Sequence, residues 1–86
     1  MIPEYLKTYK AVIRDSTICH TVQTCRMPDK GFLYETQIWV EGEAAPREEW
    51  YNDNYNDALM AHAVGFQTCC NLERKGRVWG ERYEQH

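Results

Sequence analysis

The 86-residue sequence lacks most of the features that mark an enzyme or a membrane protein. It has no glycine-rich phosphate loop, no Gly-x-Ser-x-Gly turn and no His-Glu-x-x-His helix, which are short motifs of common phosphate-binding, hydrolase and zinc-protease sites. No apolar run approaches the roughly 18 residues that a membrane-spanning helix needs. We therefore predict a non-enzymatic protein that uses no cofactor and does not enter a membrane.

Positive charge is also scarce. Ten Lys and Arg residues stand against thirteen Asp and Glu, for a net charge of −3, and the basic residues cluster only at Arg74, Lys75 and Arg77. Nucleic-acid binders need a basic surface to neutralise phosphates, so nucleic acid is disfavoured as a partner. Residues 1–5 lack the basic region and apolar core of a signal peptide. We expect a cytoplasmic protein.

The aromatic residues are numerous for a chain of this length, with three Trp, six Tyr and two Phe. Eighty-six residues form one domain, spanning residues 1–86, with a single small core. Because each aromatic side chain can bury roughly 150–250 Å², such a core cannot hold all of them. Some aromatic residues must lie at the surface, where they favour an interface with another protein.

The first third of the chain predicts β-structure. Residues 5–14 fit a strand or a helix, and their Tyr, Val and Ile content favours the strand. Asp15-Ser16 predicts a turn, and residues 17–26 are rich in the β-branched side chains of a second strand. Pro28-Asp29-Lys30-Gly31 is typical of a hairpin loop.

A third strand is predicted over residues 32–41, where hydrophobic and polar side chains alternate. The face assigned to the core carries Phe32, Tyr34, Thr36, Ile38 and Val40. The opposite face carries Leu33, Glu35, Gln37, Trp39 and Glu41. Residues 42–53 predict a loop, because Pro46 disfavours a central strand.

One long helix is predicted from about Tyr55 to Arg74. Asn54 suits the N-cap, and the carboxylate of Asp57 suits the positive end of the helix dipole. Successive steps of about 100° place the core-facing stripe on Tyr55, Leu59, Ala63, Phe66 and Cys70, flanked by His62 and Cys69. Gly65 costs about 1 kcal/mol relative to alanine in a helix, so it indicates a close contact.

Lys75-Gly76 predicts the end of this helix, and residues 77–79 predict a short final strand. The resulting fold is α+β: a small antiparallel sheet of three to four strands with one long helix packed on one face, in the order β-β-β-α-β. If residues 3–14 are helical, the order becomes α-β-β-α, which is the order of double-stranded-RNA-binding domains. The acidic and amide side chains that start the long helix argue against such a domain.

The four cysteines suggest a zinc site or a thiol site, which we keep as the alternative function. Cys19 and Cys25 would lie roughly 20 Å apart on one continuous strand. Cys69 and Cys70 are adjacent on the helix and point about 100° apart. This geometry favours structural thiols, although Cys19 or Cys25 could meet a helical cysteine between the sheet and the helix.

An acidic and aromatic segment holds the main candidate for a binding site. Six carboxylates lie between Glu41 and Asp57, opposed only by Arg47. Trp and Tyr are common anchors at protein interfaces, and a charged rim steers a partner of opposite charge. The predicted contact residues are Trp39, Glu48, Glu49, Trp50, Tyr51 and Asp53.

Two other interpretations of this segment stay open. A solvated loop could simply fold Trp50 or Tyr51 back over the core. Self-association through an exposed sheet edge and Trp39 would make a homodimer. If the segment is a binding patch, Trp50→Ala or Tyr51→Ala should abolish partner binding and leave the melting temperature nearly unchanged.

The strand Tyr34-Glu35-Thr36-Gln37-Ile38-Trp39 is followed by Glu49-Trp50-Tyr51, then by Tyr55 and the run Ala58-Leu59-Met60-Ala61-His62. This pattern covers about a third of the chain and resembles short tailed-phage accessory proteins of unassigned function. Those proteins carry Glu-Ala and Gly-His in the helix, where this chain has Asp57-Ala58 and Ala61-His62. The resemblance transfers no functional residue. It implies a phage-encoded protein in the host cytoplasm that covers a surface of a host protein or defence system and inhibits it.

Overall fold

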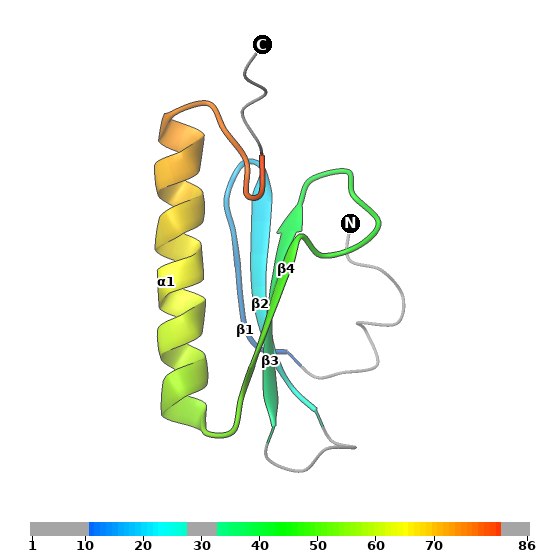
Figure 1. Ribbon diagram of the computed structural model, residues 1–86, viewed down its shortest axis with the longest axis vertical. Coiled ribbons are helices and arrows are strands. Elements are labelled where there is room, and N and C mark those ends of the chain that lie inside the picture. The colour runs from blue at the N-terminus through cyan, green and yellow to red at the C-terminus, as the bar shows by residue number, and fades with distance from the viewer. Residues whose placement is uncertain (1–10, 28–32, 82–86) are drawn as a thin grey trace.

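The computed structural model describes residues 11–27 and 33–81, which form a four-stranded antiparallel sheet with one helix packed on one face (Figure 1). The elements are β1 (Ala11–Ser16), β2 (His20–Arg26), β3 (Tyr34–Val40), β4 (Glu48–Asn52) and α1 (Tyr55–Arg74). The strands lie in the order β1-β2-β3-β4, so each strand pairs with its neighbour in the sequence. The α+β class and the single helix on an antiparallel sheet are confirmed.

The position of the fourth strand differs from the prediction. β4 precedes the helix and lies within residues 42–53, which were predicted to be a loop. Pro46 does not prevent this strand, because it lies two residues before Glu48 and outside the ladder. Residues 77–79, predicted as a strand, form no strand: residues 77–78 are irregular and Trp79 begins a turn.

The first hairpin also differs in its details. Asp15 and Ser16 belong to the end of β1, and the turn lies at residues 17–19. Thr17 forms this turn, because its backbone N–H donates to the carbonyl of His20 at 2.8 Å. Residues 1–10 and the predicted hairpin loop at residues 28–31 lie outside the described residues.

The core lies between the sheet and α1. Val22, Ile38 and Cys69 form its fully buried cluster, and Trp50, Phe66 and Trp79 pack around them. On β3 the predicted core face is confirmed for Thr36, Ile38 and Val40, which are all buried. The opposite face of β3 is also buried at Glu35, Gln37 and Trp39.

The helix begins and ends where the sequence predicts. The side chain of Asn54 accepts a hydrogen bond from the Asp57 N–H at 2.8 Å and donates to the Asp57 carboxylate at 2.7 Å. At the other end, Gly76 takes a φ of 71°, a conformation that favours glycine, and closes the last turn by donating to the carbonyl of Glu73 at 3.0 Å.

The buried side of α1 is rotated by roughly a quarter turn from the predicted stripe. Its buried residues are Ala58, His62, Gly65 and Cys69. The larger side chains of the predicted stripe lie at the flanks or in solvent; Tyr55 is 45% exposed. Small residues bring the helix close to the sheet: a Cβ atom on Gly65 would lie 3.2 Å from Cδ1 of Ile38. The predicted close contact at Gly65 is confirmed.

In the described part of the chain, no helix is long and apolar enough to cross a membrane.

Candidate functional site

The predicted contact residues Glu48, Glu49, Trp50 and Tyr51 all lie on β4, at one edge of the described sheet. Because side chains alternate along a strand, they divide between the two faces of the sheet. Glu48 and Trp50 point toward α1, and Glu49 and Tyr51 point away from it. Asp53 lies in the two-residue turn between β4 and α1 and is exposed.

Trp50 is part of the packing beneath the helix. Its ring meets Trp79 edge-on, with the ring centres 5.5 Å apart and the planes at 85°. Glu48 lies beside this pair and accepts a hydrogen bond from Nε1 of Trp79 at 3.3 Å. Trp50→Ala would therefore remove core contacts and lower stability, contrary to the expectation that Trp50 could be replaced at little cost.

Trp39 is placed differently from the other predicted contact residues. It is only 4% exposed, and its Nε1 donates to the side-chain oxygen of Gln37 at 3.1 Å. Trp39 is therefore not an exposed contact residue in this structure.

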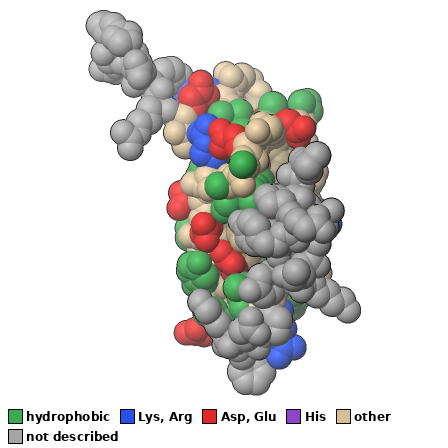
Figure 2. All heavy atoms as spheres, turned by 90° about the vertical axis from the view of Figure 1, so that its right-hand side faces the viewer, with side chains coloured by type: hydrophobic (Ala, Val, Ile, Leu, Met, Phe, Trp, Pro, Cys, Tyr) green, Lys and Arg blue, Asp and Glu red, His purple; other side chains and the backbone are tan. Residues whose placement is uncertain are grey.

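The face of the sheet opposite α1 gathers acidic groups next to β4. Tyr51 is 54% exposed and donates its hydroxyl to a carboxylate oxygen of Glu49 at 3.2 Å. Glu35, on the neighbouring strand, is buried, and this burial together with hydrogen bonding to Glu49 raises its pKa. The charge of Glu35 in turn raises the pKa of Tyr51 to about 12. Figure 2 shows acidic and hydrophobic side chains interspersed along one side of this face.

A groove runs between β4 and the first half of α1. Its volume is about 430 Å³. The residues that line it are Trp50, Tyr51, Asn52, Asp57, Met60, Ala61 and Val64. Two large apolar side chains on its helical wall reach solvent, since Met60 is 66% exposed and Val64 is 61% exposed.

Met60 and Val64 were missed as candidate site residues. They lie four positions apart and therefore share one side of the helix, outside the stripe that packs on the sheet. This spacing of two large apolar residues away from a core stripe is the signal that could have identified them. β4 and α1 together bring them next to Trp50 and Tyr51.

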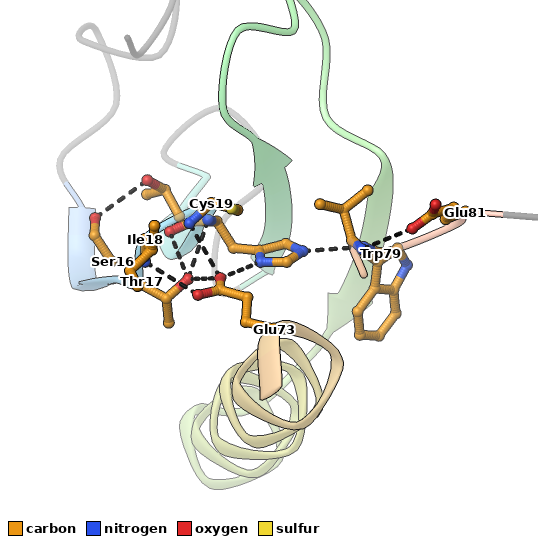
Figure 3. Close-up of polar contacts among 10 residues, drawn as sticks. Ser16, Thr17, Ile18, Cys19, Glu73, Trp79 and Glu81 are labelled. Carbon is orange, nitrogen blue, oxygen red and sulfur yellow. Dashed lines mark hydrogen bonds and ion pairs between the residues drawn. The ribbon is translucent and has the colours of Figure 1, made fainter. Parts of the chain in front are cut away.

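A polar cluster joins the end of α1 to the first hairpin (Figure 3). The Glu73 carboxylate accepts hydrogen bonds from the hydroxyl of Thr17, from the N–H groups of Ile18 and Cys19, both at 3.2 Å, and from Nδ1 of His20 at 2.5 Å. On the other side of the imidazole, Nε2 accepts the backbone N–H of Trp79 at 2.9 Å.

This arrangement determines the proton position on His20. A backbone N–H can only donate, so Nε2 carries no proton and Nδ1–H donates to Glu73. Burial alone would raise the pKa of Glu73, but the hydrogen bonds from His20, Thr17 and Cys19 bring it below its ordinary value. Glu73 is therefore held as a carboxylate that fixes the hairpin to the helix.

His62 forms a second polar connection beneath α1. Its Nε2 lies 2.7 Å from a carboxylate oxygen of Asp15, and its Nδ1 lies 2.9 Å from the hydroxyl of Thr24. An Asp-His-hydroxyl series is the arrangement of a catalytic triad. Here the hydroxyl cannot meet a substrate, because Thr24 is fully buried and hydrogen-bonded to Thr36 at 2.8 Å. The arrangement connects β1, β2 and β3 to the helix.

The cysteines Cys19, Cys25, Cys69 and Cys70 are all free thiols. Cys25 points away from the helix, because its neighbour Thr24 contacts His62, so Cys25 cannot meet a helical cysteine as considered above. Burial, then the charge of Glu73, raises the pKa of Cys69 to about 12. Across residues 11–27 and 33–81, no three His, Cys, Asp or Glu side chains are grouped so that they could hold a metal ion.

Comparison of the chain with protein-family models, with curated proteins and with solved structures finds no significant match.

Proposed function

We propose that this chain is a small, non-enzymatic binding domain that docks a partner protein in the groove between β4 and α1. The observation that carries the proposal is the groove itself, in which Trp50 is combined with the exposed Met60 and Val64, and Tyr51 lies at the rim with its hydroxyl on the opposite face of the sheet. Aromatic anchors in a preformed hollow are typical of the energetic centre of protein interfaces.

The charges around the groove indicate the chemistry of the partner. Glu49, Asp53 and Asp57 are exposed on or beside it. Arg47, the cation nearest in sequence, is already bound by the Glu43 carboxylate and donates to the backbone carbonyl of Trp79 at 2.7 Å. The acidic rim therefore favours a partner surface that combines apolar and basic groups.

The resemblance to phage accessory proteins supports a host protein as this partner. A domain that acts by binding alone inhibits by covering a surface that the host protein needs. We therefore extend the proposal to a phage-encoded inhibitor of a host protein or defence system, acting in the host cytoplasm.

The test uses two double variants with the same change of charge. Met60→Lys with Val64→Lys alters the groove. Gln67→Lys with Asn71→Lys alters exposed positions further along the same helix, outside the groove. Each variant is first checked for an unchanged circular dichroism spectrum and melting temperature.

Wild-type protein and both variants are then used to capture proteins from a bacterial host lysate, and any captured protein is purified and titrated. We expect the groove variant to bind the purified partner at least about tenfold more weakly, and the control variant to bind like the wild type. A partner that binds the folded groove variant and the wild type equally would overturn the proposal.

A further inference from the structure

The edge of β4 forms one wall of the groove, and this suggests how a partner would be held. β4 pairs with β3 from Tyr34↔Asn52 to Ile38↔Glu48, and no other described strand pairs with it. An edge strand presents backbone N–H and C=O groups that can accept a further strand. A partner segment in extended form would add main-chain hydrogen bonds to the contacts of the groove.

The two sides of such an added strand would meet different chemistry. The added strand would lie about 4.8 Å beyond β4, and its side chains would alternate between the two faces of the sheet. On the α1 side they would enter the groove and meet Met60, Ala61 and Val64. Apolar side chains fit this side, since Met60 and Val64 are more than half exposed.

On the opposite side, the same strand would lie beside Glu49 and Tyr51. Directly opposed side chains on neighbouring strands have Cβ atoms about 4.5–5.5 Å apart, and pairs of opposite charge there are favourable. The Glu49 carboxylate already accepts the Tyr51 hydroxyl, and Glu35 lies next to both, so negative charge gathers at this point. Lys or Arg side chains therefore fit this side.

We propose that the partner binds through an extended segment in which apolar and basic residues alternate, and that this segment adds to the edge of β4. This inference rests on the proposed function. β4 has five residues, so the segment needs about the same length. The acidic edge disfavours a second copy of this chain, because antiparallel pairing of β4 with itself about Trp50 places Glu49 of each copy diagonally next to Glu49 and Asp53 of the other.

The test measures the binding of two labelled peptides of about seven residues by fluorescence anisotropy. One peptide alternates Lys and Val; its isomer has the same composition, with all Val residues preceding all Lys residues. We expect the alternating peptide to bind at least about tenfold more tightly than the isomer. Glu49→Gln should weaken its binding, and methylation of alternate backbone nitrogens on the peptide edge facing β4 should abolish it.

Three outcomes would overturn this inference. The first is equal binding of the two isomers, and the second is binding of the alternating peptide that is unaffected by the Met60→Lys, Val64→Lys variant. The third is sedimentation of the protein as a dimer that the same variant dissociates, which would make a second copy the occupant. If no peptide binds but a captured partner still depends on Met60 and Val64, the proposed function stands and the strand pattern alone is wrong.

Discussion

Removal of the Glu73 carboxylate is expected to destabilise the domain strongly, although this residue lies outside the groove. In Glu73→Ala the buried Nδ1–H of His20 loses its acceptor, which costs about 1–3 kcal/mol. The hydroxyl of Thr17 and the N–H groups of Ile18 and Cys19 lose a charged acceptor, which water replaces in part, for about 1 kcal/mol more. We expect a total loss of about 2–4 kcal/mol, or roughly 10–30 °C in melting temperature for a domain of this size.

The contribution of Glu73 to the free energy of unfolding also depends on pH, and the structure determines whether it rises or falls in acid. Hydrogen bonds to its carboxylate hold the pKa of Glu73 below its unfolded value of about 4.5. The folded protein therefore favours the charged form, and the stabilisation is complete above the unfolded pKa. It is lost as the pH falls through the lower, folded pKa. The stability difference between the wild type and Glu73→Gln should shrink over this acidic range.

The assay is urea unfolding followed by circular dichroism, at neutral pH and at several acidic values. Glu41→Ala, which removes an exposed carboxylate from the loop after β3, is the matched control and should change stability by less than about 0.5 kcal/mol. Comparison of wild type and variant at each pH cancels the titration of groups that both share, such as Glu35. The reasoning would be refuted if Glu73→Ala were as stable as the Glu41→Ala control. It would also be refuted if the difference in unfolding free energy between the wild type and Glu73→Gln did not shrink in acid.

Two further predictions concern the packing of α1 and the acidic face. Gly65→Val should lower the free energy of unfolding in urea by about 1–3 kcal/mol, because the new Cβ alone would lie 3.2 Å from Cδ1 of Ile38. The control Ala63→Val, at an exposed position of the helix, should cost far less. Equal effects of the two substitutions would contradict the close helix contact. In an alkaline absorbance titration, the phenol of Tyr51 should titrate near pH 12, and it should titrate lower in Glu35→Gln because the Glu35 charge is the largest cause of the raised pKa. A Tyr51 titration near 10 in the wild type would show that the acidic cluster is not formed.

The helix was predictable because its signals are local. The Asn54 cap, the carboxylate of Asp57 and the glycine at position 76 each act within one turn of the chain. β4 was not predictable in this way, because its two glutamates and two aromatics do not form an apolar pattern. β4 is defined by its pairing with β3, which joins residues such as Tyr34 and Asn52 that are distant in sequence.

The buried side of the helix was mispredicted for a related reason. The prediction centred the contact on larger residues such as Leu59 and Phe66. In the structure the buried centre is Ala58, His62, Gly65 and Cys69, and Phe66 packs at its flank. Which side of the helix is buried depends on the distance between helix and sheet, and the local sequence does not determine that distance. This rotation leaves Met60 and Val64 beside β4, where the prediction had found only Trp50 and Tyr51.

The polar connections of α1 lie on one side of the sheet, and this has a mechanical consequence. His62 and Glu73 tie the helix to β1, to β2 and to the turn between them. On the β4 side, Gly65 of the helix packs against Trp50, and the hydrogen bonds to Glu48 and Arg47 come from Trp79, which follows the helix. The side chains of α1 itself are therefore hydrogen-bonded to the sheet on the β1–β2 side, and we expect a ligand that enters the groove to displace the β4 side of the helix more easily than the β1–β2 side.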